Sequence, residues 1–236
     1  MPATVNVTNL KSAEVRLSHE AWEFEAAYAD KIDTYWAYRC EQQPTLFNGE
    51  VLMLRYWSLQ SGRFSGQCIK ADYKSFLYWR EHNAPDPSVV DFFATAALYS
   101  REGWLILGRS GTDMSNAGEI YPPCGSLQLG EFGRDLDLDA SIVREVHEET
   151  GIEIDSSQLG PPVLIEAFPQ LVLIRPANLE ITASEIVHRI DRHLRSTATR
   201  ELDGSVVVKD RSAIQEAMPP FTIAYIRYVF REERDK

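Results

Sequence analysis

The apolar residues of the N-terminal part first follow a helical period. Between Ser18 and Gln42 they recur at steps of three and four residues, which is the spacing of a helix that buries one face. Ser18 is a candidate N-cap, because a serine oxygen can accept a hydrogen bond from the first free backbone N–H groups. Pro44 enforces the end, since the residue before a proline avoids the helical region. The pattern therefore predicts one helix over residues 18–42.

The next segment changes from the helical period to strand-like runs. Residues 51–59 and 64–70 flank a Ser61-Gly62 turn, and together they predict a β-hairpin. Residues 72–82 predict a second helix. This N-terminal block is rich in aromatic residues. We expect most of them to fill a small core, whereas one or two could stack on a flat ligand ring.

A short stretch with two prolines, NAPDPS at residues 83–88, marks a candidate boundary. Beyond it we expect strands at 89–99, 104–107, 162–168, 171–174 and 205–209, and helices ending at Thr150-Gly151 and spanning 182–194, 212–218 and 221–233. This mixture predicts an α/β or α+β fold. We expect residues 1–88 to form an α+β extension packed on a domain at 89–236, because so small a block needs a larger sheet to join.

The composition is that of a globular protein with an acidic surface. The 236 residues are 44% hydrophobic and carry a formal net charge of −11. That charge argues against nonspecific binding to nucleic acid or to anionic membranes. A phosphate-bearing substrate is still compatible, since a bound cation can reverse the local sign of the charge. Three widely spaced cysteines form no disulfide framework, and no apolar run has the length of a signal peptide or membrane span, which favours a cytoplasmic location.

The segment with the most chemical information is REVHEETGI, residues 144–152. On a helix, Glu145, Glu148 and Glu149 stand at positions i, i+3 and i+4, so three carboxylates share one face. A divalent cation would compensate their mutual repulsion, because Mg²⁺ prefers carboxylate and water oxygens. For three glutamates alone, a solvated acidic face beside Arg144 is the simpler interpretation.

The residues that precede this helix change that balance. Gly125, five further residues and Glu131 come first, and the whole resembles the Nudix box, G-x5-E-x7-R-E-U-x-E-E-x-G-U, in which U is a bulky apolar residue. Residues 144–152 match every fixed position in the second half of this pattern. Twelve residues separate Glu131 from Arg144 where the family has seven, so the box carries a five-residue insertion. A loop insertion of this kind costs little free energy.

The resemblance to Nudix proteins implies an α/β/α sandwich with a mixed sheet, in which the box forms a strand, a loop and a helix. It implies that the three helix glutamates bind Mg²⁺ or Mn²⁺, with Glu148 and Glu149 at the centre of catalysis. Arg144 would orient them through charge-assisted hydrogen bonds. Glu131 would support the metal site, and the backbone near Gly125 would contribute a carbonyl oxygen and contact the substrate.

Nudix proteins are mostly hydrolases that cleave a diphosphate linked to another moiety. The resemblance therefore implies a metal-dependent pyrophosphohydrolase with a nucleotide-type small molecule as substrate, and it is compatible with a homodimer. The stretches PTLFNGEVLMLRYWSL and DYKSFLYW resemble part of the animal Nudix enzymes that split UDP-sugars. This suggests a UDP-sugar or an ADP-ribose-like compound, with Arg55 as a candidate phosphate ligand. Glu148, Glu149, Glu166 and Glu185 are candidates for the base that activates water.

Two other functions remain compatible with the sequence. A Nudix domain can serve as a non-catalytic ligand-binding or regulatory protein, although such domains usually have degraded boxes and this helix keeps all three glutamates. The aromatic N-terminal block could instead be the docking surface of a protein-interaction module, which a large exposed aromatic patch would support. The intact glutamate helix favours the hydrolase.

Overall fold

The computed structural model describes residues 5–112, 114–125, 127, 135–197 and 201–231, which form one mixed sheet of eleven strands with helices around it. The strands are β1 (Asn6–Asn9), β2 (Ser12–Leu17), β3 (Glu50–Gln60), β4 (Arg63–Asp72), β5 (Val90–Tyr99), β6 (Leu105–Ser110), β7 (Ile120–Tyr121), β8 (Asp135–Leu136), β9 (Val163–Ala167), β10 (Gln170–Asn178) and β11 (Leu202–Val208). The helices are α1 (Glu23–Ala27), α2 (Ala29–Gln42), α3 (Tyr73–Glu81), α4 (Leu138–Thr150), α5 (Ala183–Ser196) and α6 (Pro220–Val229). No helix in this part of the chain combines the length and the apolar character that a membrane span needs.

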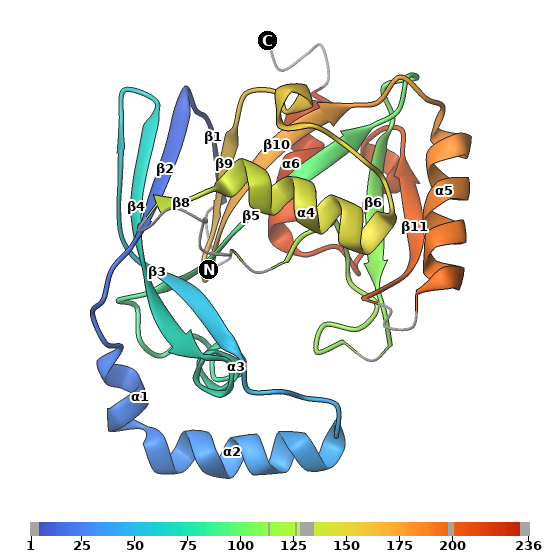
Figure 1. The fold of residues 1–236 in the computed structure, drawn as a ribbon. Coiled ribbons are helices and arrows are strands. Elements are labelled where there is room, and N and C mark those ends of the chain that lie inside the picture. Colours follow the sequence, from blue (N-terminus) through green and yellow to red (C-terminus); the bar gives the residue numbers. More distant parts are fainter. Residues whose placement is uncertain (1–4, 113, 126, 128–134, 198–200, 232–236) are drawn as a thin grey trace.

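The sheet runs in the order β1-β9-β10-β5-β3-β4-β2-β8, and β6 branches from β5 to pair with β7 and β11. Helices cover both faces of its central part (Figure 1): α4 and α5 lie on one face and α6 lies on the other. Side chains of β10 alternate accordingly, with Leu171 and Leu173 packing on the α4 side and Val172 and Ile174 packing on the α6 side. The predicted α/β class is therefore confirmed, and the layers agree with an α/β/α sandwich.

The N-terminal extension, residues 1–88, has its own apolar cluster and joins the same sheet. Trp22, Ile32 and Trp79 are almost completely buried between α1, α2, α3 and the hairpin of β3 and β4. Strand β3 pairs with β5 where Met53 faces Asp91, and β1 pairs with β9 at the opposite edge of the core. Strand β2 also pairs with β8, so three strand pairings among the described residues tie the extension to the rest of the chain. A domain boundary near residue 88 stays a prediction.

The single helix expected over residues 18–42 is wrong in its first half. Two helices occupy this range, and the break lies at Tyr28, whose backbone angles are φ −117° and ψ 14°. Ser18 caps neither helix, because its hydroxyl accepts instead from the N–H of Glu20 at 3.3 Å. The break lies where both Phe24 and Tyr28 pack against Tyr78 of α3, with ring centroids 6.2 Å and 6.3 Å apart.

The elements from the hairpin onward follow the prediction more closely. The expected strands at 51–59, 64–70, 89–99, 104–107, 162–168, 171–174 and 205–209 coincide with β3, β4, β5, β6, β9, β10 and β11. The helix expected over 212–218 is wrong, because only a 3-10 turn forms at Arg211–Ala213. Pro219 contributes to this outcome by disfavouring a helical residue before it. Strands β1 and β2 were not predicted.

The aromatic residues of the extension divide between core and surface. Phe76, Tyr78 and Trp79 are buried, which confirms the core interpretation for these three. Tyr56 and Trp57 are exposed on the outer half of β3, with relative exposures of 49% and 41%. The expectation that most of the aromatic block fills a core is therefore met only in part.

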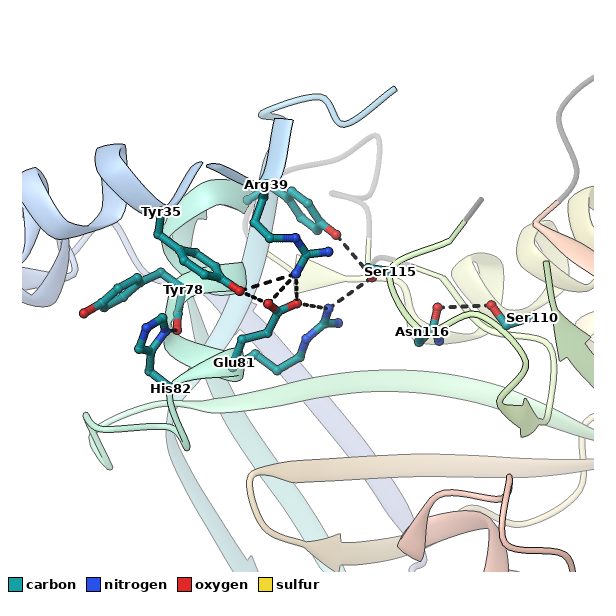
Figure 2. Close-up of polar contacts among 10 residues, drawn as sticks. Tyr35, Arg39, Tyr78, Glu81, His82, Ser110, Ser115 and Asn116 are labelled. Carbon is teal, nitrogen blue, oxygen red and sulfur yellow. Dashed lines mark hydrogen bonds and ion pairs between the residues drawn. The ribbon is translucent and has the colours of Figure 1, made fainter. Parts of the chain in front are cut away.

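A polar cluster holds the C-terminal end of α3 against α2 (Figure 2). Arg39 donates to both carboxylate oxygens of Glu81, and the hydroxyl of Tyr35 donates to the same carboxylate. Burial raises the pKa of Glu81, but the hydrogen bonds from Arg39 and Tyr35 outweigh this effect and hold the pKa below its usual value. The cluster therefore stabilises the extension only while Glu81 is ionised.

We predict that Glu81→Gln lowers the free energy of unfolding by about 1 kcal/mol at neutral pH, as expected for a partly exposed ion pair. Since the folded pKa of Glu81 lies below its usual value of 4.5, its contribution is fully present above that pH and is lost as the pH falls through the folded pKa. Urea titrations of the two proteins should therefore converge in acid. A gap that stays constant into acid would contradict the prediction, and Glu41→Gln, exposed on α2, is the control.

Candidate active site

Helix α4 is fixed in place by its caps and its apolar face. Asp137 caps its start by accepting a hydrogen bond from the N–H of Ala140 at 2.9 Å. Gly151 ends it with φ 66°, a left-handed conformation that glycine adopts at little cost. Ile142 and Val146 are 1% and 0% exposed and pack against the sheet. This packing sets the rotation of the helix and hence the direction of its glutamates.

Two of the three predicted glutamates are almost completely removed from water. Glu145 and Glu149, one turn apart, are 6% and 5% exposed, whereas the side chain of Glu148 is 56% exposed. Burial is the main cause that raises the pKa of Glu145 and of Glu149, and the nearby carboxylate of Glu201 raises both further. Such carboxyl groups are stabilised by a proton, a hydrogen-bond donor or a cation.

The remaining polar contacts of these glutamates differ. Arg144 lies between two of them, with Nη2 2.5 Å from Glu145 Oε1 and Nη1 2.6 Å from Glu148 Oε2. Glu149 accepts a hydrogen bond from the backbone of Cys124, but its Oε2 is buried and has no hydrogen-bond partner among the described residues. A buried carboxylate oxygen without a partner costs free energy, so this atom favours a ligand.

The backbone at Gly125 lies directly against the Glu145 carboxylate. A Cβ atom on Gly125 would overlap that carboxylate, so only glycine fits without displacing it. The segment before it is anchored to β5, because Thr95 Oγ1 donates to the carbonyl of Pro123 at 2.6 Å. Cys124 is half-buried, and burial together with the nearby carboxylates raises the pKa of its thiol well above the usual value. The thiol therefore stays protonated and is a poor nucleophile.

These groups line one side of a pocket of about 460 Å³. The N-terminal extension supplies another side, through Met53 of β3 and through Tyr73, Phe76 and Arg80 of α3. The loop at 114–119, between β6 and β7, also lines it. A volume of this size suits a nucleotide-sized molecule. Segments far apart in the sequence thus build one pocket.

Among the predicted site residues that the structure describes, Arg55 does not line this pocket. Glu131 lies outside the described residues. Arg55 donates to the carbonyl of Ala21 and to the carboxylate of Glu23, both at 2.8 Å, and so holds α1 against β3. The basic residue of the extension that does line the pocket is Arg80.

The structure also changes the set of candidates for the base that activates water. Glu166, in β9, and Glu185, which pairs with Arg189 at 2.9 Å, are absent from the lining of the pocket, whereas Glu201 is part of it. Glu201 and Arg80 are not predicted as site residues from the sequence, because both are distant from the box. The sequence does contain a signal for Arg80. Tyr73, Phe76 and Arg80 stand at positions i, i+3 and i+7 of α3, so the arginine shares one helix face with two aromatic pocket residues.

The donor set fits a hard divalent cation. No three His, Cys, Asp or Glu side chains in the described ranges are already gathered as metal ligands, and Arg144 pairs with two of the glutamates. Nevertheless, two buried carboxylates with raised pKa values, one of them with an unpartnered oxygen, provide the hard oxygen ligands that Mg²⁺ and Mn²⁺ prefer. A cation here would offset the repulsion among Glu145, Glu149 and Glu201.

Comparison with known proteins finds distant structural likenesses only. No family model and no curated protein matches the chain. A MutT protein from Methanosarcina mazei Go1, from the Nudix group, is 19% identical over 62% of this chain and 98% of its own, with a TM-score of 0.42. The E. coli ORF135 protein is 17% identical over 61% and 94%, with a TM-score of 0.37. The T. brucei MERS1 protein in its apo form is 14% identical over 91% and 99%, with a TM-score of 0.33. The function is therefore inferred from the residues of this chain.

We predict that Gly125→Ala displaces the Glu145 carboxylate and weakens metal binding. The added methyl group should lower the free energy of unfolding by about 1–3 kcal/mol, as overpacking does, and weaken Mn²⁺ binding at least several-fold. Urea denaturation and a Mn²⁺ titration followed by electron paramagnetic resonance would measure the two effects. Gly204→Ala is the matched control, because a Cβ there meets nothing within 4 Å. Equal Mn²⁺ affinity in Gly125→Ala and the wild type would refute the prediction.

Proposed function

We propose that the chain is a metal-dependent Nudix-type pyrophosphohydrolase that cleaves the diphosphate of a nucleoside diphosphate linked to another moiety. The burial of Glu145 and Glu149 carries this proposal, because a solvated acidic face would leave both carboxylates in water, and they are 6% and 5% exposed. Their position in a pocket of nucleotide size adds support. The unpartnered Oε2 of Glu149 supplies a reason for a cation to bind there.

The chemistry follows from the charges. Glu145, Glu148 and Glu149 would hold Mg²⁺, which supplies neutralisation of the phosphate oxygens and acidifies a bound water. Arg144 keeps the carboxylates of Glu145 and Glu148 oriented through its two ion pairs. The base must lie in the pocket and exchange its proton with solvent. Glu148 and Glu201 both line the pocket and are exposed, so they are the two candidates for this role.

The substrate is proposed to be a UDP-sugar or an ADP-ribose-like compound. Tyr73, a half-buried residue of the pocket wall, offers an aromatic ring for a flat base. A ligand-binding regulator with the same pocket is the alternative. It would bind these compounds without turnover, so a hydrolysis assay separates the two functions.

We predict phosphate release, coupled to a phosphatase, from one class in a panel of UDP-sugars, ADP-ribose, NAD and dinucleoside polyphosphates. EDTA should abolish turnover and Mg²⁺ should restore it. Glu149→Gln should lower kcat by roughly a hundredfold or more, because it removes a carboxylate from the proposed metal site. Glu153→Gln, an exposed glutamate just after α4, should keep wild-type activity.

Two results would overturn the hydrolase. One is turnover that persists unchanged in EDTA, and the other is a fully active Glu149→Gln. Absence of turnover across the panel, together with a thermal shift caused by one of the compounds, would support the ligand-binding alternative instead.

A further inference from the structure

Arg80 is a basic residue of the pocket that the metal-site argument does not use. The described lining of the pocket holds two basic side chains, Arg80 and Arg144, and Arg144 is paired with two glutamates of α4. Burial raises the pKa values of Asp91, in β5, and of Glu119, in the loop before β7, and the nearby charge of Arg80 opposes both rises. Its charge thus acts on the side of the pocket away from α4.

The contacts of Arg80 leave most of its hydrogen-bonding capacity unused. Its Nη2 donates to Ser115 Oγ at 3.0 Å and lies 3.8 Å from Glu81 Oε1, which is longer than a hydrogen bond. Its Cζ lies 5.2 Å from the centroid of the Phe76 ring, which supports the guanidinium plane. The hydroxyl of Tyr73 is 3.5 Å from the same Ser115 oxygen. A guanidinium has five N–H donors in a fixed fork, so several remain for a ligand in the pocket.

The carboxylate nearest to Arg80 in sequence, that of Glu81, is bound more closely by other donors than by Arg80. The carboxylate of Glu81 lies 3.8 Å from Arg80 Nη2, but Arg39 and Tyr35 occupy both of its oxygens (Figure 2). Without Arg39, Glu81 would be free to pair with Arg80. Arg39 therefore competes with Arg80 for Glu81, and we infer that it acts as a positioning residue for Arg80.

We propose that Arg80 is the phosphate-binding residue that the N-terminal extension contributes to the pocket, and that it holds diphosphate oxygens not covered by the proposed metal site. A planar guanidinium that is fixed by Ser115 and Phe76 matches the paired oxygens of a phosphate. The pocket is otherwise strongly acidic, so an anion that enters it needs such a cation on the side away from α4. This inference rests on the proposed function in that the ligand is a diphosphate compound.

The test measures binding, so it needs no turnover. Methylenediphosphonate, a diphosphate analogue that resists hydrolysis, is titrated calorimetrically into the full chain with Mg²⁺ and with EDTA. Arg80→Ala should raise the Kd roughly tenfold or more, as expected for the loss of charge-assisted hydrogen bonds. Arg80→Lys should fall between Arg80→Ala and the wild type, because it keeps the charge and loses the fork. Arg63→Ala, an exposed arginine of β4, should bind as the wild type does.

The positioning of Arg80 has its own test. Arg39→Ala should weaken binding several-fold, because Glu81 can then capture Arg80. The double variant Arg39→Ala/Glu81→Gln should restore affinity towards that of the wild type, since a neutral glutamine does not compete for the guanidinium. A loss caused only by a disturbed fold would not be rescued by a second change in the same cluster.

The outcomes separate this proposal from the hydrolase. If Arg80→Ala binds the analogue as Arg63→Ala does while Glu149→Gln loses affinity, the Arg80 proposal is overturned and the metal site stands. If Mg²⁺ and Glu149→Gln have no effect but Arg80→Ala still weakens binding, the proposed metal site fails and Arg80 stands. If the double variant stays as weak as Arg39→Ala, the positioning role is overturned.

Discussion

The structure depends on the burial of two carboxylates of helix α4, whose rotation about its own axis is fixed by packing. Ile142 and Val146 pack α4 against the sheet, and this directs Glu145 and Glu149 inward rather than to solvent. Burial of a carboxylate is unfavourable unless a donor or a cation compensates it. Arg144 and the Cys124 backbone provide part of that compensation, and one oxygen of Glu149 is left without a partner in the described structure. Gly125 is a necessary consequence, because the inward carboxylate leaves no room for a side chain.

The N-terminal extension gives this site its second side. Backbone pairing of β3 with β5 continues the central sheet into the hairpin, and α3 packs on that hairpin. The helix therefore presents Tyr73, Phe76 and Arg80 to the same pocket as the glutamates. Its end is held by Glu81, whose ion pair with Arg39 fastens α3 to α2, while the adjacent Arg80 lies 3.8 Å from the same carboxylate. The cluster that stabilises the extension thus adjoins the residue proposed to bind the ligand.

The sequence predicted what is local and periodic. The box helix, its glutamates and most strands are encoded in short patterns, so their positions could be derived without the structure. Glu201 and Arg80 could not be placed, because they reach the pocket through strand pairing and helix packing rather than through spacing to the box. The break at Tyr28 lies where Phe24 and Tyr28 pack against Tyr78 of α3, and such contacts between distant segments can override a continuous helical period. Strands β1 and β2 are short, and their pairing with β9 and β4 joins distant segments, which single-segment patterns do not report.

The charge of the pocket constrains how a diphosphate could bind. Its described lining includes Asp91, Glu119, Glu201 and the three glutamates of α4, against only two arginines. An anion would meet net repulsion in such a pocket. A bound cation would therefore raise the affinity for the anion, and a bound anion would raise the affinity for the cation by the same factor. Arg80 weakens the repulsion on the side that a metal held by α4 does not reach. A pocket with both features would reject anions in the absence of metal while holding the two parts of a bridged diphosphate from opposite sides. The acidic character of the site thus becomes a source of selectivity rather than an obstacle to phosphate binding.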